Sequence, residues 1–197
     1  MGSTPTRERI LDAALDLFGA RGVDAVSLDD IAAVVGVRKQ SVLYWFASKA
    51  ELVDAVLDRA AFELVAVMDA AIRASGPDPL DRIDSIVCAV FRPVVRRPTL
   101  LGLIREVGRL DAHHVRHLAD RLAPQIADAR AYLERQIASG SLRMGDPGLI
   151  AAMVYATVTG IGTDRQLLDT VGWVPDAAGL RRLRDQLRAF LRAALAP

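Results

Sequence analysis

Cysteine, lysine and aromatic residues are scarce in this chain of 197 residues. Its single cysteine, Cys88, excludes an intramolecular disulfide, and the apolar neighbours of Cys88 favour a small buried hydrophobe over a reactive thiol. No apolar run reaches membrane-spanning length, and the sequence shows no signal peptide. We therefore expect a cytoplasmic protein without a membrane partner.

Acidic and basic side chains almost balance, and the net charge of +1 excludes the strongly basic class of protein that coats nucleic acid. The distribution of the charged residues is more informative than the net charge, because the only two lysines, Lys39 and Lys49, lie in one short segment. Residues 1–60 still carry seven basic and nine acidic side chains. Any attraction to a polyanion must therefore come from a few well-placed cations and from helix N-termini.

Helical periodicity runs through nearly the whole chain, and no convincing strand pattern interrupts it. The fold class is therefore all-α, with Pro124 expected to kink or split a long helix over about 113–139. Breaker residues at 75–79 mark the clearest joint. We predict an N-terminal three-helix unit in residues 1–50 and a C-terminal helical body in residues 51–197. The body is expected to contain helices over about 80–96, 99–110, 113–139, 147–171 and 177–195.

Residues 27–46 have the pattern of a helix-turn-helix. Ala32 is followed four residues later by Gly36, a spacing that lets two short helices cross closely around a tight turn. Capping boxes that begin at Ser27 and Ser48 supply helix-start signals on either side. A plain helical hairpin would share the Ala-x-x-x-Gly spacing. The caps, the short polar second helix and the two lysines favour DNA binding instead.

The second helix of this pair, residues 38–46, has two faces. An ideal helical wheel turns one face toward the protein, at Val42, Leu43 and Phe46. The opposite face would meet base edges with Gln40, Ser41 and Tyr44. Glutamine can form paired hydrogen bonds with adenine, serine can donate to or accept from several bases, and the tyrosine ring suits a thymine methyl or a phosphate.

Further residues are expected to contact phosphates or adjoining bases. Arg38 and Lys39 lie in the first turn of the helix, where the long lysine side chain can reach guanine or phosphate. Lys49 begins the next helix beside free backbone amides, which favours a phosphate clamp. Ser27, at the start of the first helix of the pair, is expected to act similarly.

These residues resemble the N-terminal segment of the tetracycline-repressor (TetR) family of bacterial regulators. The resemblance covers roughly residues 6–56 and rests on Ile10, Ala13, Ala14, Leu17, Phe18, Gly22, Ser27, Ile31, Ala32, Gly36, Val37, Phe46, Ser48, Lys49 and Leu52. It implies a homodimeric repressor that binds a palindromic operator in double-stranded DNA. It also implies that a small molecule bound in the C-terminal body releases the DNA.

The chain departs from the family pattern where base choice is made. Leu43 occupies a position that is commonly tyrosine, so the phosphate contact of that tyrosine passes to Tyr44 or Trp45 or is lost. Gln40 and Arg38 replace residues that are often small. The resemblance therefore carries over DNA binding but no particular operator.

The family forms its dimer through the last two helices of each subunit. Here those helices offer an apolar stripe and small residues that fit such an interface, at Leu183, Leu187, Phe190, Leu191, Ala156 and Gly160. Packing inside one chain fits the stripe equally well. We adopt the dimer because two half-sites multiply affinity and specificity. A row of arginines, at Arg184, Arg188 and Arg192, is expected to be a solvated face rather than a second DNA contact.

The effector pocket that the resemblance implies would lie among the middle helices. Candidate lining residues are Phe91, Leu103, Arg105, Met153 and Tyr155, each of which also fits an ordinary core. The abundance of valine, leucine and alanine indicates an apolar effector, and no cofactor is predicted.

Three histidines lie close together at His113, His114 and His117. Positions 113 and 117 are one helical turn apart, and such a pair can bind zinc. Only Asp111 and Asp120 lie nearby in the sequence to complete a ligand set. A solvated histidine cluster is therefore the favoured interpretation, and no metal is predicted.

Enzymatic signatures are missing from the sequence. It contains no glycine-rich phosphate loop, no nucleophile elbow and no histidine pair with a catalytic glutamate. We therefore predict a ligand-responsive transcriptional regulator and no enzyme. Two alternatives stay open, a helical protein-interaction module without DNA binding and, less favoured, an all-α enzyme.

Overall fold

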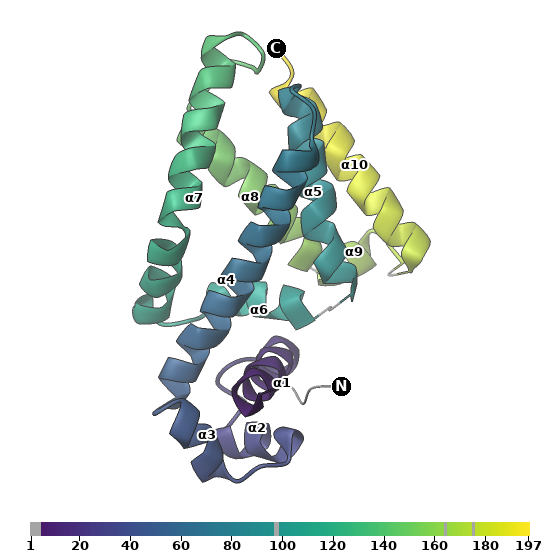
Figure 1. Cartoon of the computed structure of the whole chain (residues 1–197). Helices are drawn as coiled ribbons and strands as arrows, with labels where there is room; N and C mark the ends of the chain where they lie inside the picture. The colour runs from purple at the N-terminus through teal and green to yellow at the C-terminus, as the bar shows by residue number, and fades with distance from the viewer. Residues whose placement is uncertain (1–4, 97–98, 164, 175) are drawn as a thin grey trace. The chain divides into compact units, whose positions relative to one another are not determined.

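The computed structural model describes residues 5–96, 99–163, 165–174 and 176–197, apart from some side chains near the ends of these ranges. These residues form only α-helices, as predicted. In chain order (Figure 1) the helices are α1 Thr6–Arg21, α2 Leu28–Val35, α3 Lys39–Trp45, α4 Lys49–Ala74, α5 Pro79–Arg96, α6 Thr99–Val107, α7 Ala112–Ala138, α8 Pro147–Thr163, α9 Arg165–Thr170 and α10 Ala177–Leu195. Over the described ranges, no helix is both long enough and apolar enough to cross a membrane.

The sequence left two alternatives at Pro124, a kink or a split of the long helix. Helix α7 continues through Pro124, so the helix is not split. The helix predicted over 147–171 corresponds in the described residues to α8, Pro147–Thr163, and α9, Arg165–Thr170. Residue 164 lies outside the described part of the chain.

The chain divides into two compact units. The first comprises Met1–Glu63 and Arg97–Arg121, and the second comprises Leu64–Arg96 and Leu122–Pro197. Helices α4 and α7 therefore each supply residues to both units. The two units are distinguished by how compactly their residues pack and not by function. The functional boundary predicted after residue 50 therefore stays a prediction.

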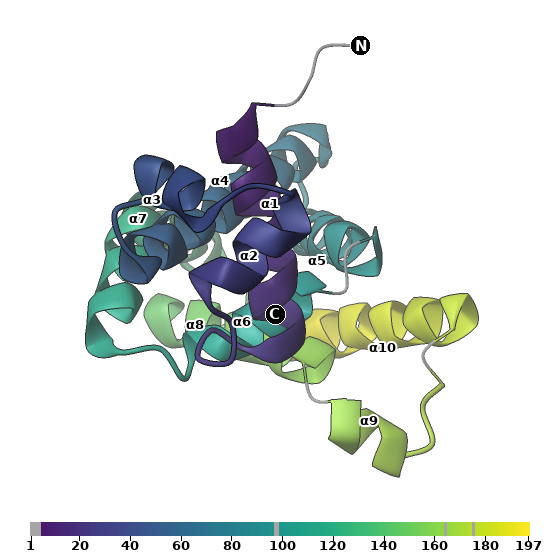
Figure 2. The same ribbon diagram turned by 90° about the horizontal axis from the view of Figure 1, so that it is seen from below.

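The core of the first unit is built on α1. Ile10, Ala14 and Phe18 recur at helical spacing, are fully buried, and pack with buried residues of α2, α3 and α4. Burying a large apolar side chain contributes about 1.5–3 kcal/mol. Val42 and Phe46 belong to this core, so the position of α3 depends on apolar burial. Figure 2 shows α1, α2 and α3 of this unit from below.

The backbones of α6 and α1 lie in direct contact. A Cβ atom added to Gly102 would lie 1.7 Å from the carbonyl oxygen of Gly19, and one added to Gly19 would lie 2.0 Å from the carbonyl oxygen of Thr99. The hydroxyl of Thr99 also donates a 2.7 Å hydrogen bond to Asp16. Only glycine permits this approach, which fixes α6 to the three-helix unit.

In the second unit α5 packs against α10. Val87 forms a buried cluster with Leu187 and Leu191. Beside it, the buried Asp84 carboxylate accepts hydrogen bonds of 2.9 Å from Arg188 and 2.6 Å from Arg192. The arginine row was expected to be a solvated face, but Arg188 and Arg192 are only partly exposed and pair with Asp84. Helical periodicity cannot show that an acidic residue of α5 lies opposite them.

Candidate nucleic-acid interface

The turn between α2 and α3 is closed by Gly36. This residue has φ 75° and ψ 36°, the left-handed conformation that costs other residues about 1–2 kcal/mol. The amides of Gly36 and Val37 both donate to the carbonyl of Ala32, at 2.9 and 3.0 Å. These bonds end α2 and turn the chain into α3, as the Ala-x-x-x-Gly spacing predicted.

Side-chain caps begin α2 and α4. The Ser27 hydroxyl accepts from the amide of Asp30 at 3.1 Å, and the Asp30 carboxylate accepts from the amide of Ser27 at 2.8 Å. Hydrogen bonds from Ser27 hold the pKa of Asp30 below its ordinary value. At α4 the amide of Glu51 donates to the Ser48 hydroxyl, while Glu51 accepts from Ala47. The Ser27 hydroxyl is thus already engaged within its cap.

Helix α3 has one buried and one exposed face. Val42 is completely buried and Phe46 nearly so. Gln40 is exposed and Ser41 half-buried, while Tyr44 is 80% exposed. Leu43, predicted to face the core, is 37% exposed, so that prediction was wrong. Seven residues make α3 less than two turns long, and its inward face has room for only two anchors.

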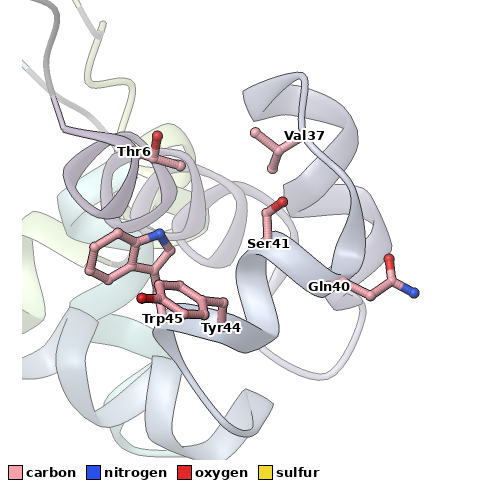
Figure 3. Close-up of a pocket in the computed structure, with 6 residues that line it drawn as sticks. All are labelled: Thr6, Val37, Gln40, Ser41, Tyr44 and Trp45. Carbon is pink, nitrogen blue, oxygen red and sulfur yellow. The ribbon is translucent and has the colours of Figure 1, made fainter.

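An open depression of about 410 Å³ lies along the exposed face (Figure 3). Three of its lining residues, Gln40, Ser41 and Tyr44, were predicted to contact DNA, and Trp45 was predicted only through the family resemblance. Thr6 and Val37 also line the depression and were not predicted as contacts. The rings of Tyr44 and Trp45 meet edge to face with centroids 5.2 Å apart. Gln40 extends away from the other labelled side chains in Figure 3.

The predicted cations border this surface. Arg38 is the N-terminal flanking residue of α3 and is exposed. Lys49 is the first residue of α4 and is half-buried. Lys39 forms a 2.8 Å ion pair with the exposed Asp29 of α2. That pairing was not predicted, because Asp29 and Lys39 are separated by the turn.

Arginines of α1 and α4 hold the surface in place. The guanidinium of Arg9 donates to the carbonyl of Val35 at the end of α2. The guanidinium of Arg7 lies 5.3 Å from the centre of the Phe46 ring. Arg59 of α4 pairs with Glu8 at 2.6 Å, which ties α4 to α1. These contacts were not predicted, because nothing in the local sequence pattern indicates contacts at such separations.

The candidate effector residues whose side chains are described fall in both units. Leu103 is buried in the core of the first unit, which favours the ordinary-core interpretation. Met153 and Tyr155 are exposed on α8 in the second unit. The side chains of Phe91 and Arg105 lie outside the described part of the chain. The pocket therefore stays a prediction.

The candidate dimer residues fall into two groups. Leu187 and Leu191 are buried inside the chain against α5, with Leu183 packed beside them. Packing within one chain, the alternative that the sequence left open, accounts for these three. The other candidates, Phe190, Ala156 and Gly160, are exposed. They stay predictions for a subunit interface.

Comparisons of sequence locate the resemblance in the N-terminal region. The family model described as "Bacterial regulatory proteins, tetR family" matches residues 10–56. The HTH-type transcriptional repressor BepR of Brucella suis biovar 1 (strain 1330) is 36% identical over 86 residues, which are 44% of this chain and 41% of BepR. The HTH-type transcriptional regulator SrpR of Pseudomonas putida is 48% identical over 52 residues, 26% of this chain and 24% of SrpR. The chain thus spans less than half the length of these curated relatives.

Solved structures extend the similarity of fold to the whole chain. FadR of Bacillus subtilis, solved in complex with stearoyl-CoA, has a TM-score of 0.80 at 16% identity, over 95% of this chain and 98% of that one. The ketosteroid transcriptional regulator KstR2 of Mycobacterium tuberculosis has a TM-score of 0.74 at 22% identity, over 100% of this chain and 97% of that one. At these identities the match establishes a shared fold.

Proposed function

We propose that this chain, whose residues 10–56 match the model of the tetR family of bacterial regulatory proteins, is a DNA-binding transcriptional regulator whose helix α3 enters the major groove. One observation carries the proposal, the division of α3 into an anchored and an open face. Val42 and Phe46 are buried, whereas Gln40 and Tyr44 are open to solvent. A second helix held from behind and polar in front is the geometry with which helix-turn-helix proteins contact base edges.

Each side chain of the open face has a role in this proposal. Gln40 forms paired hydrogen bonds with adenine, and Ser41 donates to or accepts from a neighbouring base. Tyr44 contacts a thymine methyl or a phosphate. Lys49 and Arg38, with the helix N-termini beside them, bind the phosphate backbone and fix the orientation of α3.

The active form in this proposal is a homodimer on a palindromic operator. Two copies of α3 would lie about 34–36 Å apart, one turn of the DNA. Phe190 of α10 supports the proposal, because a large apolar side chain that is 60% exposed suits a subunit interface.

Substitution of Phe190 tests the dimer. Phe190→Glu is expected to shift the chain toward monomer in analytical ultracentrifugation and to weaken operator binding. Ala189→Glu is the matched control, because it places the same charge at an exposed position about 100° around α10. Equal sedimentation of both variants and the unsubstituted chain would remove Phe190 from the interface.

The regulator is proposed to be a repressor released by an apolar small molecule. Such a ligand weakens DNA binding only by its difference in affinity between the free and DNA-bound forms. The apolar composition of the body supports this class of effector, and the fold neighbour FadR was solved with stearoyl-CoA, a ligand with a long acyl chain. Long-chain acyl thioesters are therefore the first effectors to test.

Mobility shift with fragments of the source genome tests DNA binding. We expect a specific fragment, including one from upstream of the gene for this chain, to be retained over unrelated DNA of equal length. Retention should fall as salt increases, because bound phosphates release counterions. Failure to retain any fragment specifically at low salt would contradict the proposal and favour a protein-interaction module.

A further inference from the structure

An aspartate of α4 faces two adjacent histidines of α7 within the first unit. Asp54 Oδ1 lies 2.6 Å from Nδ1 of His114, and Asp54 Oδ2 lies 3.0 Å from Nε2 of His113. One carboxylate therefore contacts two imidazoles from a single side. The carboxylate comes from a position about sixty residues earlier in the chain, which is why the sequence offered no ligand set.

One turn further along α4, a second carboxylate has different partners. Asp58 Oδ1 lies 3.0 Å from Nε2 of His117 and accepts a 2.8 Å hydrogen bond from Nε of Arg121. A guanidinium is permanently positive and has no lone pair for a metal. Asp58 is therefore held in an ion pair with a residue that cannot bind a metal, whereas Asp54 contacts only residues that can act as metal ligands.

The donor atoms of Asp54, His113 and His114 all lie within 4.8 Å of one another. Zinc binds imidazole nitrogen at about 2.0–2.1 Å and carboxylate oxygen at about 2.0–2.2 Å, so neighbouring ligand atoms of a tetrahedral ion lie roughly 3.4 Å apart. The two carboxylate–imidazole distances, 3.0 and 2.6 Å, are shorter than this by less than an ångström. Small side-chain rotations would suffice to admit an ion.

The surroundings of the three residues suit a metal ligand set. The side chain of His114 is 8% exposed and that of His113 is 66% exposed, so the cluster has an anchored ligand and one open to solvent.

Asp111 supports the cluster from behind. Its Oδ1 accepts hydrogen bonds from the backbone amides of His113 and His114, at 2.9 and 3.2 Å, and thereby fixes the first turn of α7. Its Oδ2 lies 3.9 Å from Nε2 of His114, the ring nitrogen that faces away from Asp54. This separation exceeds a hydrogen bond, so Asp111 orients the two histidines through their backbone amides.

From this arrangement we propose that Asp54, His113 and His114 form a binding site for a divalent transition-metal ion of the Zn²⁺ class, with water as the fourth ligand. Imidazole nitrogens favour zinc and similar ions, whereas Mg²⁺ and Ca²⁺ prefer all-oxygen sites. The site joins α4 to the start of α7. The proposal does not depend on DNA binding.

Isothermal titration of the chelator-treated full chain with zinc sulfate, without DNA, tests the proposal. We expect one Zn²⁺ per chain, and with Co²⁺ the visible absorption of a tetrahedral site. Asp54→Asn and His113→Ala should each weaken Zn²⁺ binding at least about tenfold, because loss of even an outer partner of a zinc ligand costs about 10–100-fold. A large excess of Mg²⁺ should not displace Zn²⁺.

Asp58→Asn and His117→Ala are the matched controls. They make the same chemical changes on the same helices, one turn away, and should leave Zn²⁺ affinity within about twofold of the unsubstituted chain. Circular dichroism confirms that each variant is folded. No stoichiometric Zn²⁺ binding, or equal weakening by Asp54→Asn and Asp58→Asn, would overturn the site and leave the DNA-binding proposal unaffected.

Discussion

Lys39 Nζ and Asp29 Oδ2 lie 2.8 Å apart, joining the first residue of α3 to α2 across the turn. The pair is exposed, so its contribution to stability is at most about 1 kcal/mol. Its importance lies in its position beside the surface proposed to meet DNA. Asp29 competes with a phosphate or a guanine for the ammonium of Lys39 and places a negative charge near the proposed DNA surface.

Replacement of Asp29 should therefore strengthen DNA binding. Asp29→Asn removes the competing carboxylate, and we expect a roughly two- to fivefold lower Kd for specific and non-specific DNA alike, equivalent to up to about 1 kcal/mol. Lys39→Ala should weaken binding and reduce the salt dependence by about one counterion. Fluorescence anisotropy at several salt concentrations measures both effects. Asp24→Asn, which removes an exposed acid from the loop before α2, is the charge control, and equal gains in the two variants would contradict a specific role for the pair.

Two substitutions should separate sequence recognition from phosphate binding. Gln40→Ala is expected to relax the preference at one base pair and to cost about 1–3 kcal/mol on the specific site. Lys49→Ala should weaken binding to all sequences by a similar factor. Selection of bound DNA from a randomised library measures both preferences. An unchanged preference in Gln40→Ala would contradict the proposed role of that residue.

The turn before α3 should favour glycine over residues with a side chain. Nothing lies within 4 Å of a Cβ added to Gly36, so Gly36→Ala introduces backbone strain without a clash. We expect a loss of about 1–2 kcal/mol in the free energy of unfolding, together with weaker DNA binding. Gly140, with φ 72° and equally open surroundings, is the matched control. Urea unfolding should show a similar loss for Gly140→Ala, whose DNA affinity should be unchanged.

Asp84 should make stability depend on pH. Its burial would raise its pKa, but hydrogen bonds from Arg188 and Arg192 outweigh burial and lower it. A carboxyl whose pKa is lowered by folding stabilises the protein above its unfolded pKa of about 3.9, and the contribution disappears as the pH falls through the folded pKa. Asp84→Asn should thus cost about 1–3 kcal/mol at pH 7 and nothing at the lowest pH.

Urea unfolding of both proteins between pH 7 and the acid limit measures this difference. A gap between Asp84→Asn and the unsubstituted chain that stays constant with pH would show that the carboxylate charge is not the source of the stability.

Much of the fold followed from local sequence patterns. Gly36 at the turn and the caps at Ser27 and Ser48 predicted the bounds of α2 and α3 and the start of α4 to within about two residues. These signals are local, because each depends on residues within one or two turns. The buried anchors Val42 and Phe46 followed in the same way, whereas Leu43 did not, because an ideal wheel overstates the buried width of so short a helix.

Contacts between distant residues escaped the sequence analysis. Asp84 lies opposite Arg188 and Arg192, and Asp54 lies opposite His114, across separations of 60 to 108 residues. Periodicity shows which face of a helix is apolar but not which other helix meets it. For that reason periodicity predicts a solvated arginine row and does not bring Asp54 to the histidines.

Methylation protection of guanine N7 on a retained operator fragment tests the central claim most directly, because N7 is exposed in the major groove. We predict two protected patches on one face of the DNA, with centres one helical turn apart. In Gln40→Ala, we predict altered protection that is confined to these patches. Protection that spares the major groove, or a pattern unaffected by substitution of Gln40, Ser41 and Tyr44 together, would contradict the claim that the outward face of α3 contacts the bases.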